Sequence, residues 1–97
     1  MSKALTLLGF ARKAGRLAVG TAATEDAIKR KKAYLAITAS DISEKSSKEI
    51  RFLCEKHGIK FIKPTFDTYE ITGAIGTRAG IIAVLDEGFA AAIAENL

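Results

Sequence analysis

The sequence has few of the residues from which metal sites and catalytic centres are built. Its 97 residues include one cysteine, one histidine, one proline and no tryptophan. Cys54 has no partner for an intramolecular disulfide, which suits a reducing compartment and predicts a cytoplasmic protein. Because structural zinc ions are held by about four Cys or His ligands, we expect no metal. No motif indicates a cofactor.

Long apolar runs are also absent, and a membrane-spanning helix needs about 20 consecutive apolar residues. We therefore expect no membrane partner. The apolar stretch near the N-terminus is broken by Arg12 and Lys13, and no cleavage pattern follows it, so it is not expected to be a signal peptide. A chain of 97 residues has the length of one domain, which we expect to extend over residues 1–97.

No arrangement of side chains predicts a catalytic centre. Cys54 and His57 lie on one apolar helical stripe, where a buried thiol and an imidazole at a helix end are the simpler interpretation. The glycine-rich segment 73–80 follows a helix, whereas a dinucleotide-binding glycine loop lies between a strand and a helix. Asp86 and Glu87 begin a helix, where acidic side chains stabilise the N-terminus. We therefore expect a protein that is not an enzyme.

Positive charge is concentrated in the first third of the chain. Residues 1–32 contain eight basic and two acidic residues, a net charge of +6, whereas residues 33–97 contain seven basic and nine acidic residues, a net charge of −2. Such an asymmetry is typical of a protein that meets a polyanion with one part of its surface. The alternative is that these lysines and arginines only solvate helix faces.

The spacing of apolar residues predicts helices that alternate with short strands. Helices are expected over residues 2–14, 21–31, 44–57, 67–76 and 87–95, and strands over residues 17–19, 34–39, 59–62 and 81–85. This alternation favours an α/β protein in which helices cover both faces of one sheet, a three-layer α/β/α sandwich.

Two of the expected helices begin with a capping signal. Thr21 is placed to cap the second helix with its hydroxyl group. Asp67 and Glu70 have the spacing of a capping box, and Phe66 and Ile71 are placed as a hydrophobic staple across it. The inner stripe of the second helix is expected to comprise Thr24, Ala27, Ile28 and Lys31.

Three segments, in this order and spacing, resemble one family of RNA-binding proteins. The first is LGFARKAGRL at residues 8–17. The second runs from Val19-Gly20-Thr21 through a helix ending in RKKA to the strand at residues 34–39 and Ser40-Asp41. The third is LCEKHGI at residues 53–59, followed by YEITGAIG at residues 69–76. Over residues 5–89 the chain is similar to the archaeal and eukaryotic ribosomal proteins that bind kink-turn RNA, and most of all to their short bacterial members, the YlxQ-type proteins.

The resemblance implies a sandwich around a mixed four-stranded sheet. It also implies an RNA surface formed by residues 20–26, at the start of the second helix, and by the loop at residues 76–80. In the family, a Gly-Thr-Asn-Glu-x-x-Lys sequence opens the second helix, and its Asn, Glu and Lys side chains read guanine edges of sheared G·A pairs. Gly20 and Thr21 match this pattern, but the three reading positions are Ala22, Ala23 and Asp26.

Several charged residues are expected at or near the same surface. Asp26 is spaced to pair with Arg30, and Glu25 with Lys29, which lowers the free positive charge of the second helix. The resemblance implies a basic residue in the loop at residues 76–80, at the position of Arg78. It also implies that side chains of the loop cover the splayed base of the kink-turn, and here only Thr77 and Ala79 stand at those positions. Lys13 and Arg16 flank the turn before the second helix, and we expect them to contact phosphates close to the start of that helix.

The resulting hypothesis is non-catalytic binding of structured RNA, of the kink-turn or ribosomal kind, mainly through backbone and shape contacts. The expected partners are structured RNA, such as ribosomal RNA, or the ribosome, and the protein itself is expected to be monomeric. The expected RNA-binding residues are Lys13, Arg16, Gly20, Thr21, Ala22, Ala23, Asp26, Arg30, Thr77 and Arg78. The alternative is a protein-interaction module on the same fold that has lost kink-turn recognition. Ala22, Ala23 and Asp26 favour this alternative, to which the alanine-rich last helix could contribute a surface.

Overall fold

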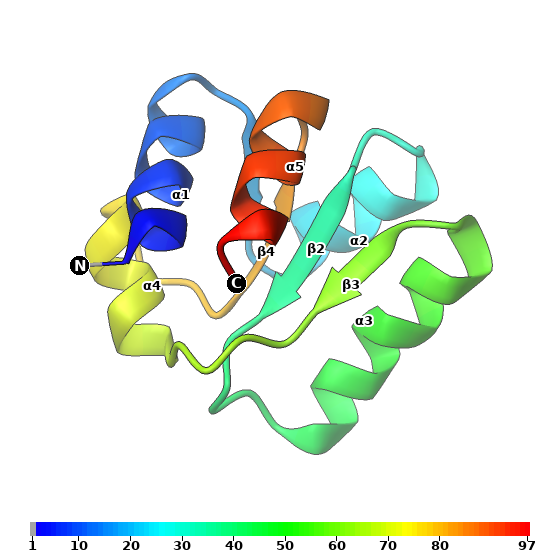
Figure 1. The fold of residues 1–97 in the computed structure, drawn as a ribbon. Helices are drawn as coiled ribbons and strands as arrows, with labels where there is room; N and C mark the ends of the chain where they lie inside the picture. The colour runs from blue at the N-terminus through cyan, green and yellow to red at the C-terminus, as the bar shows by residue number, and fades with distance from the viewer. Residues whose placement is uncertain (1) are drawn as a thin grey trace.

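The computed structural model describes residues 2–97, which form five helices and four strands in alternation (Figure 1). The helices are α1 (Lys3–Lys13), α2 (Thr21–Lys29), α3 (Glu44–His57), α4 (Thr68–Ile75) and α5 (Glu87–Glu95). The strands are β1 (Leu17–Val19), β2 (Leu35–Thr38), β3 (Lys60–Ile62) and β4 (Ile81–Val84). Each element expected from the sequence is present, and the observed ends differ from the expected ones by a few residues.

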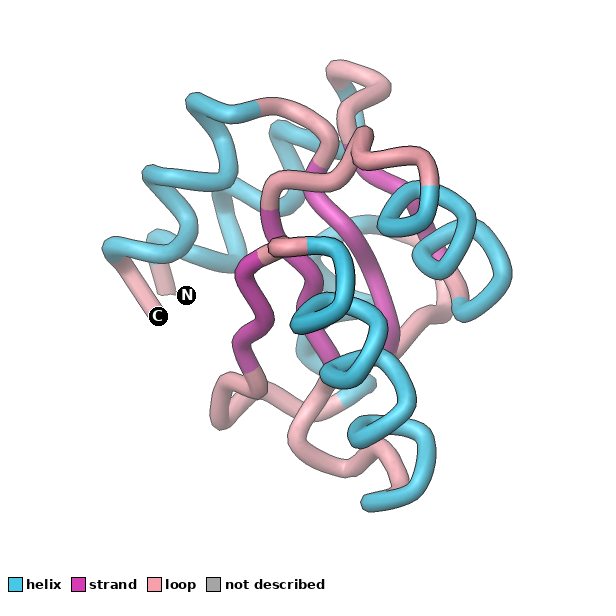
Figure 2. The backbone as a smooth tube through the Cα atoms, turned by 90° about the vertical axis from the view of Figure 1, so that its right-hand side faces the viewer, coloured by secondary structure: helices cyan, strands magenta, loops and turns pink. Residues whose placement is uncertain are grey.

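The four strands form one mixed sheet in the order β1-β4-β2-β3. The strand β4 pairs antiparallel with both β1 and β2, and the edge strand β3 pairs parallel with β2. Every residue of β2 and β4 is buried, as expected for central strands covered on both faces. Figure 2 shows helices on both sides of the strands, so the expected three-layer α/β/α sandwich is confirmed.

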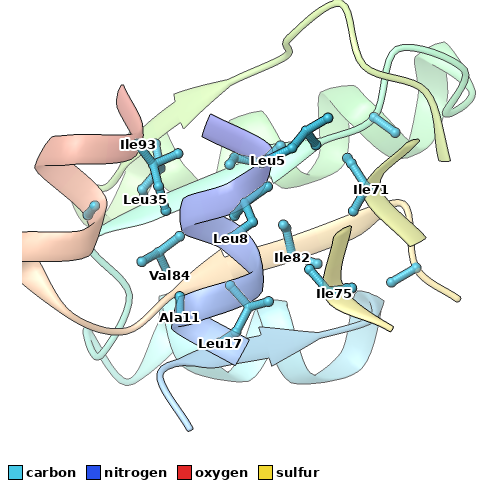
Figure 3. Close-up of a cluster of buried hydrophobic side chains, with 14 residues drawn as sticks. Leu5, Leu8, Ala11, Leu17, Leu35, Ile71, Ile75, Ile82, Val84 and Ile93 are labelled. Carbon is cyan, nitrogen blue, oxygen red and sulfur yellow. The ribbon is translucent and has the colours of Figure 1, made fainter. Parts of the chain in front are cut away.

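One face of the sheet packs against α1, α4 and α5 (Figure 3). Leu35 and Ile37 of β2 and Ile82 and Val84 of β4 alternate with residues that point to the other face. They meet apolar side chains of the three helices: Leu5, Leu8, Ala11, Ile71, Ile75, Ala90 and Ile93. The last helix therefore uses Ala90 and Ile93 to pack on the sheet.

The opposite face packs against α2 and α3. Ala36 and Ala83 have small side chains there, which lets Ile28, Ile50 and Cys54 of the two helices approach the sheet closely. The hydroxyl groups of Thr38 and Ser47 are buried and lie 3.1 Å apart in a hydrogen bond that joins β2 to α3. Among residues 2–97, no helix is long and apolar enough to cross a membrane.

Helix ends follow the expected capping chemistry at most positions. The Asp67 carboxylate accepts a hydrogen bond from the Glu70 amide, and the Glu70 carboxylate accepts one from the Asp67 amide, so the capping box is confirmed. Asp86 caps α5 by accepting from the amide of Phe89. Gly58 and Gly76 end α3 and α4 in the left-handed conformation.

The second helix differs from its predicted form at both ends. Thr21 is not its N-cap but its first helical residue, and Gly20 occupies the cap position. The helix ends at Lys29, and Lys31 lies beyond it in an exposed left-handed turn with φ 56°. Lys31 is therefore not part of the inner stripe, because the tight turn before β2 directs the chain away from the helical path. The other three stripe residues are buried, as predicted.

Candidate nucleic-acid interface

The start of α2 is a sharp glycine turn fastened to the sheet. Gly20 has φ 98° and ψ 166°, a backbone conformation that residues with a side chain rarely adopt. Its amide donates a hydrogen bond of 2.8 Å to the carbonyl of Ile81, the first residue of β4. Its carbonyl accepts from the amide of Thr24 at 3.0 Å. These two bonds fix where α2 begins relative to the end of the loop that precedes β4.

That loop, between α4 and β4, is held to its neighbours by hydrogen bonds at one end. The amide of Ala79 donates to the hydroxyl of Thr72 at 3.3 Å, and the carbonyl of Gly80 accepts from the amide of Ala39 at 2.7 Å. Ala79 is only 7% exposed, so its methyl group belongs mainly to the core and offers a splayed base little apolar cover. The exposed tip of the loop carries Arg78, with Thr77 half-buried beside it.

Gly80 packs so closely against two side chains that any Cβ atom there would force them to shift. A Cβ atom at this position would lie 2.5 Å from Cδ1 of Ile42 and 2.7 Å from the hydroxyl oxygen of Thr68. Thr68 is itself oriented by Asp41, whose carboxylate accepts from the Thr68 amide at 2.9 Å and from its hydroxyl at 2.7 Å. The hydrogen bond from the Thr68 hydroxyl is the main cause that lowers the pKa of Asp41. The loop is therefore supported by fixed contacts between segments that are far apart in the sequence.

Together these segments enclose a hollow of about 430 Å³. It brings the turn at Gly20 and Thr21 together with Arg78, as the sequence predicted for the two parts of an RNA surface. Its lining residues are Gly20, Thr21, Ile42, Thr68, Arg78, Ala79, Gly80 and Ile81. Ile42 and Thr68 were missed by the sequence analysis, because neither belongs to a motif and only the fold brings them beside Gly80.

The hollow contains the start of a helix that no side chain caps. Gly20 makes no side-chain hydrogen bond to α2, whereas Ser2, Ser43, Asp67 and Asp86 cap the other helices of the described chain. Ala22 and Ala23, in the first turn after Thr21, are exposed and end in methyl groups. Backbone N–H groups in the first turn of a helix have no partner within that helix and attract anions.

Of the two ion pairs expected on α2, only one is formed within residues 2–97. Nε of Arg30 lies 3.0 Å from a carboxylate oxygen of Asp26, in an exposed i, i+4 ion pair. The expected Glu25–Lys29 ion pair is not among those formed within residues 2–97. Arg30 follows the last residue of a nine-residue helix, about 13 Å from its start at 1.5 Å per residue. The structure therefore does not bring Arg30 to the hollow.

The two basic residues near the first turn occupy different places. Lys13 is exposed at the end of α1 and lines a separate, shallow site between α1 and α4 together with Gly76, which precedes the Arg78 loop. The carbonyl of Arg16 accepts from the amide of Leu85, just after β4 ends, whereas Gly20 bonds to the residue where β4 begins. Arg16 therefore lies at the opposite end of β1 from the start of α2, not beside it as the sequence suggested.

The comparisons identify the family of this chain. Residues 2–94 match the Ribosomal protein L7Ae/L30e/S12e/Gadd45 family. The chain belongs to this family. The resemblance seen in the sequence is thereby confirmed over almost the whole chain.

Two relatives agree with this assignment. The chain is 32% identical over 88 residues to the RNA-binding protein YlxQ of Enterococcus faecium, an alignment that covers 91% of this chain and 84% of that protein. It is 27% identical to a protein of Bacillus halodurans whose solved structure is described as having unknown function. The two structures superpose with a TM-score of 0.93 over 98% of this chain and 96% of the other. The α/β fold is therefore shared with an experimentally determined relative.

Proposed function

We propose that this member of the L7Ae/L30e/S12e/Gadd45 family binds structured RNA without catalysing a reaction. The observation that carries the proposal is the hollow in which the uncapped start of α2 adjoins the Arg78 loop. A relative that is 32% identical is named an RNA-binding protein, which supports the same function here.

Each part of the hollow suits an RNA backbone. The N–H groups at the start of α2 and the positive end of its dipole favour a phosphate. The glycine at the turn has no side chain, so a sugar–phosphate chain can approach closely. Arg78 is exposed and makes no ion pair within residues 2–97, so its guanidinium is free to form two hydrogen bonds to one phosphate.

Base recognition is expected to contribute less than in relatives with the full reading motif. Ala22 and Ala23 have no polar atoms in their side chains, and Asp26 carries a negative charge that is partly neutralised by Arg30. The RNA would therefore be selected by its bent shape and by backbone contacts rather than by guanine edges. The RNA is of the kink-turn or ribosomal kind, and the protein binds it as a monomer in the cytoplasm.

A titration against two RNAs tests the proposal. One is a kink-turn with tandem sheared G·A pairs, and the other is a straight duplex of the same length and composition. We expect tighter binding to the kink-turn. The logarithm of its affinity should fall with the logarithm of salt concentration at a slope of about −3 to −5, for about four to six phosphate contacts. Equal affinity for both RNAs would contradict shape selection, and no binding to either would favour the protein-interaction alternative.

A further inference from the structure

A second hollow lies along the outer side of the sandwich, between α2 and α3. It encloses about 520 Å³ and is lined by Glu25, Lys29, Lys45, Lys48, Glu49, Phe52 and Leu53. Phe52 is 66% exposed, whereas the neighbouring apolar residues of α3, Ile50 and Cys54, are buried against the sheet. The fold therefore gains little from Phe52, and its ring is open to a ligand.

This hollow lies farther along the helix that begins at the candidate RNA surface. Thr21, Glu25 and Lys29 follow one another at intervals of four residues, so they form a row along one side of α2. The row begins in the first hollow, which Thr21 lines, and ends in the second, which Glu25 and Lys29 line. The opposite wall is a stripe of α3 with the spacing Lys45, Lys48 and Phe52.

We propose that this hollow, which we call the α2–α3 groove, holds an unpaired nucleotide that extends beyond the kink-turn of the RNA bound at the start of α2. Its base stacks on the ring of Phe52, and its neighbouring phosphates contact Lys45 and Lys48. The proposal rests on the proposed function, because the groove extends the same RNA surface along the same helix.

The chemistry of the groove agrees with a single-stranded segment of RNA. Surfaces that hold such segments combine positive charge, which follows the backbone, with an aromatic ring on which a base stacks. The groove has three lysines against two glutamates, and none of the three lysines is ion-paired within the described chain. An acidic peptide could use the same lysines, but the row of α2 residues that leads from the candidate RNA surface to the groove favours RNA.

The test compares three RNAs. One is a blunt two-stranded kink-turn, and the other two are the same kink-turn extended by four adenosines at the 3′ end of one strand or of the other. For the wild type, we expect one extension to tighten binding by about 5- to 100-fold, the usual effect of a stacked base. Phe52→Ala should remove this gain and leave the affinity for the blunt RNA unchanged. Tyr69→Ala is the matched control, because Tyr69 is 84% exposed but lies outside the groove, and it should keep the gain.

A second measurement reports stacking directly. The chain has no tryptophan, so Phe52→Trp places its only tryptophan at the groove, where it can be excited apart from the two tyrosines. We expect this variant to retain the gain from the extension, and its fluorescence to be quenched by the extended RNA but not by the blunt RNA. Lys48→Glu should weaken binding of the extended RNA more than binding of the blunt RNA.

The outcomes separate this inference from the proposed function. If the wild type binds the blunt kink-turn but neither extension adds affinity, the groove is not an RNA subsite, and an acidic protein segment becomes its candidate occupant. A gain that survives in Phe52→Ala would also overturn the inference. If the wild type binds no kink-turn at all, the proposed function fails and this inference fails with it.

Discussion

The amide of Gly20 donates to the carbonyl of Ile81 across 2.8 Å, which ties the first turn of α2 to the first residue of β4. The bond requires the chain to turn with φ 98° and ψ 166° at Gly20. The position of the exposed helix start beside the Arg78 loop therefore depends on a backbone conformation that only glycine adopts readily.

Gly20→Ala should lower the free energy of unfolding by about 1–3 kcal/mol, the usual cost of placing a side chain in such a conformation. A Cβ atom there would meet nothing within 4 Å, so the cost is conformational rather than steric. Gly73→Ala is the matched control, because its Cβ atom would also meet nothing, but Gly73 lies within α4 and should gain about 1 kcal/mol. Urea unfolding of the two variants measures both effects. Equal changes would contradict the special role of Gly20.

Arg78→Glu should reduce affinity for a kink-turn RNA by about tenfold or more, because it removes a phosphate contact and adds repulsion. Stability should change little, since Arg78 is exposed and makes no ion pair within residues 2–97. Arg16→Glu should cost less affinity, because Arg16 lies at the far end of β1. Lys63→Glu makes the same charge change away from the hollow and is the control. A loss for Lys63→Glu as large as for Arg78→Glu would point to net charge rather than to this site.

Burial of the Cys54 thiol predicts a decline of stability in alkaline solution. Burial first, and the neighbouring Glu55 carboxylate second, raise the pKa of Cys54 from 9.0 to about 11. The folded protein therefore holds this proton more tightly than the unfolded chain does. The resulting stabilisation is complete below about pH 9 and is lost as the pH rises through about 11. Cys54→Ala should show a flatter decline over this range, because it has no thiol whose proton the folded state holds more tightly. If the stabilities of the two proteins fell with pH in parallel, the raised pKa of Cys54 would be contradicted.

Much of the fold could be predicted from the sequence, because its local signals agree with its tertiary packing. The alternation of β2 and β4 between two apolar clusters follows directly from their continuous apolar runs. The capping box at Asp67 and Glu70 is a local interaction and was correctly located. Thr21 was assigned wrongly as a cap, because Gly20 can adopt the turn that places the cap one residue earlier.

The candidate site was less predictable, because it depends on contacts between distant segments. The two parts of the hollow were located through the family resemblance, but their contact is made by the Gly20–Ile81 bond. Ile42 and Thr68 line the hollow through the close packing at Gly80, for which no sequence pattern exists. The position of Arg16, at the far end of β1 from the start of α2, likewise follows from the pairing of β1 with β4.

Restoring the family's reading residues provides the sharpest test of the start of α2. The triple variant Ala22→Asn, Ala23→Glu and Asp26→Lys should bind a kink-turn RNA about 10- to 1000-fold more tightly than the wild type. Good base-edge contacts contribute about 1–3 kcal/mol each, and adjacent contacts need not add. Ala22 and Ala23 are exposed, so the larger side chains can point into solvent or RNA. The loss of the Asp26–Arg30 pair, which is more than 60% exposed on both sides, should cost only about 0.3–0.5 kcal/mol.

The single variant Asp26→Lys separates charge from base recognition. It should steepen the salt dependence of binding by about one unit of slope, as for one added phosphate contact, and should strengthen kink-turn and duplex binding alike. The triple variant should increase the preference for the kink-turn over the duplex much more, because Asn and Glu add hydrogen bonds to guanine edges beside the new cation. If the wild type already prefers the kink-turn as strongly as the triple variant does, residues 22, 23 and 26 do not read the RNA. If neither protein prefers the kink-turn, this chain has kept the fold of its family without that recognition.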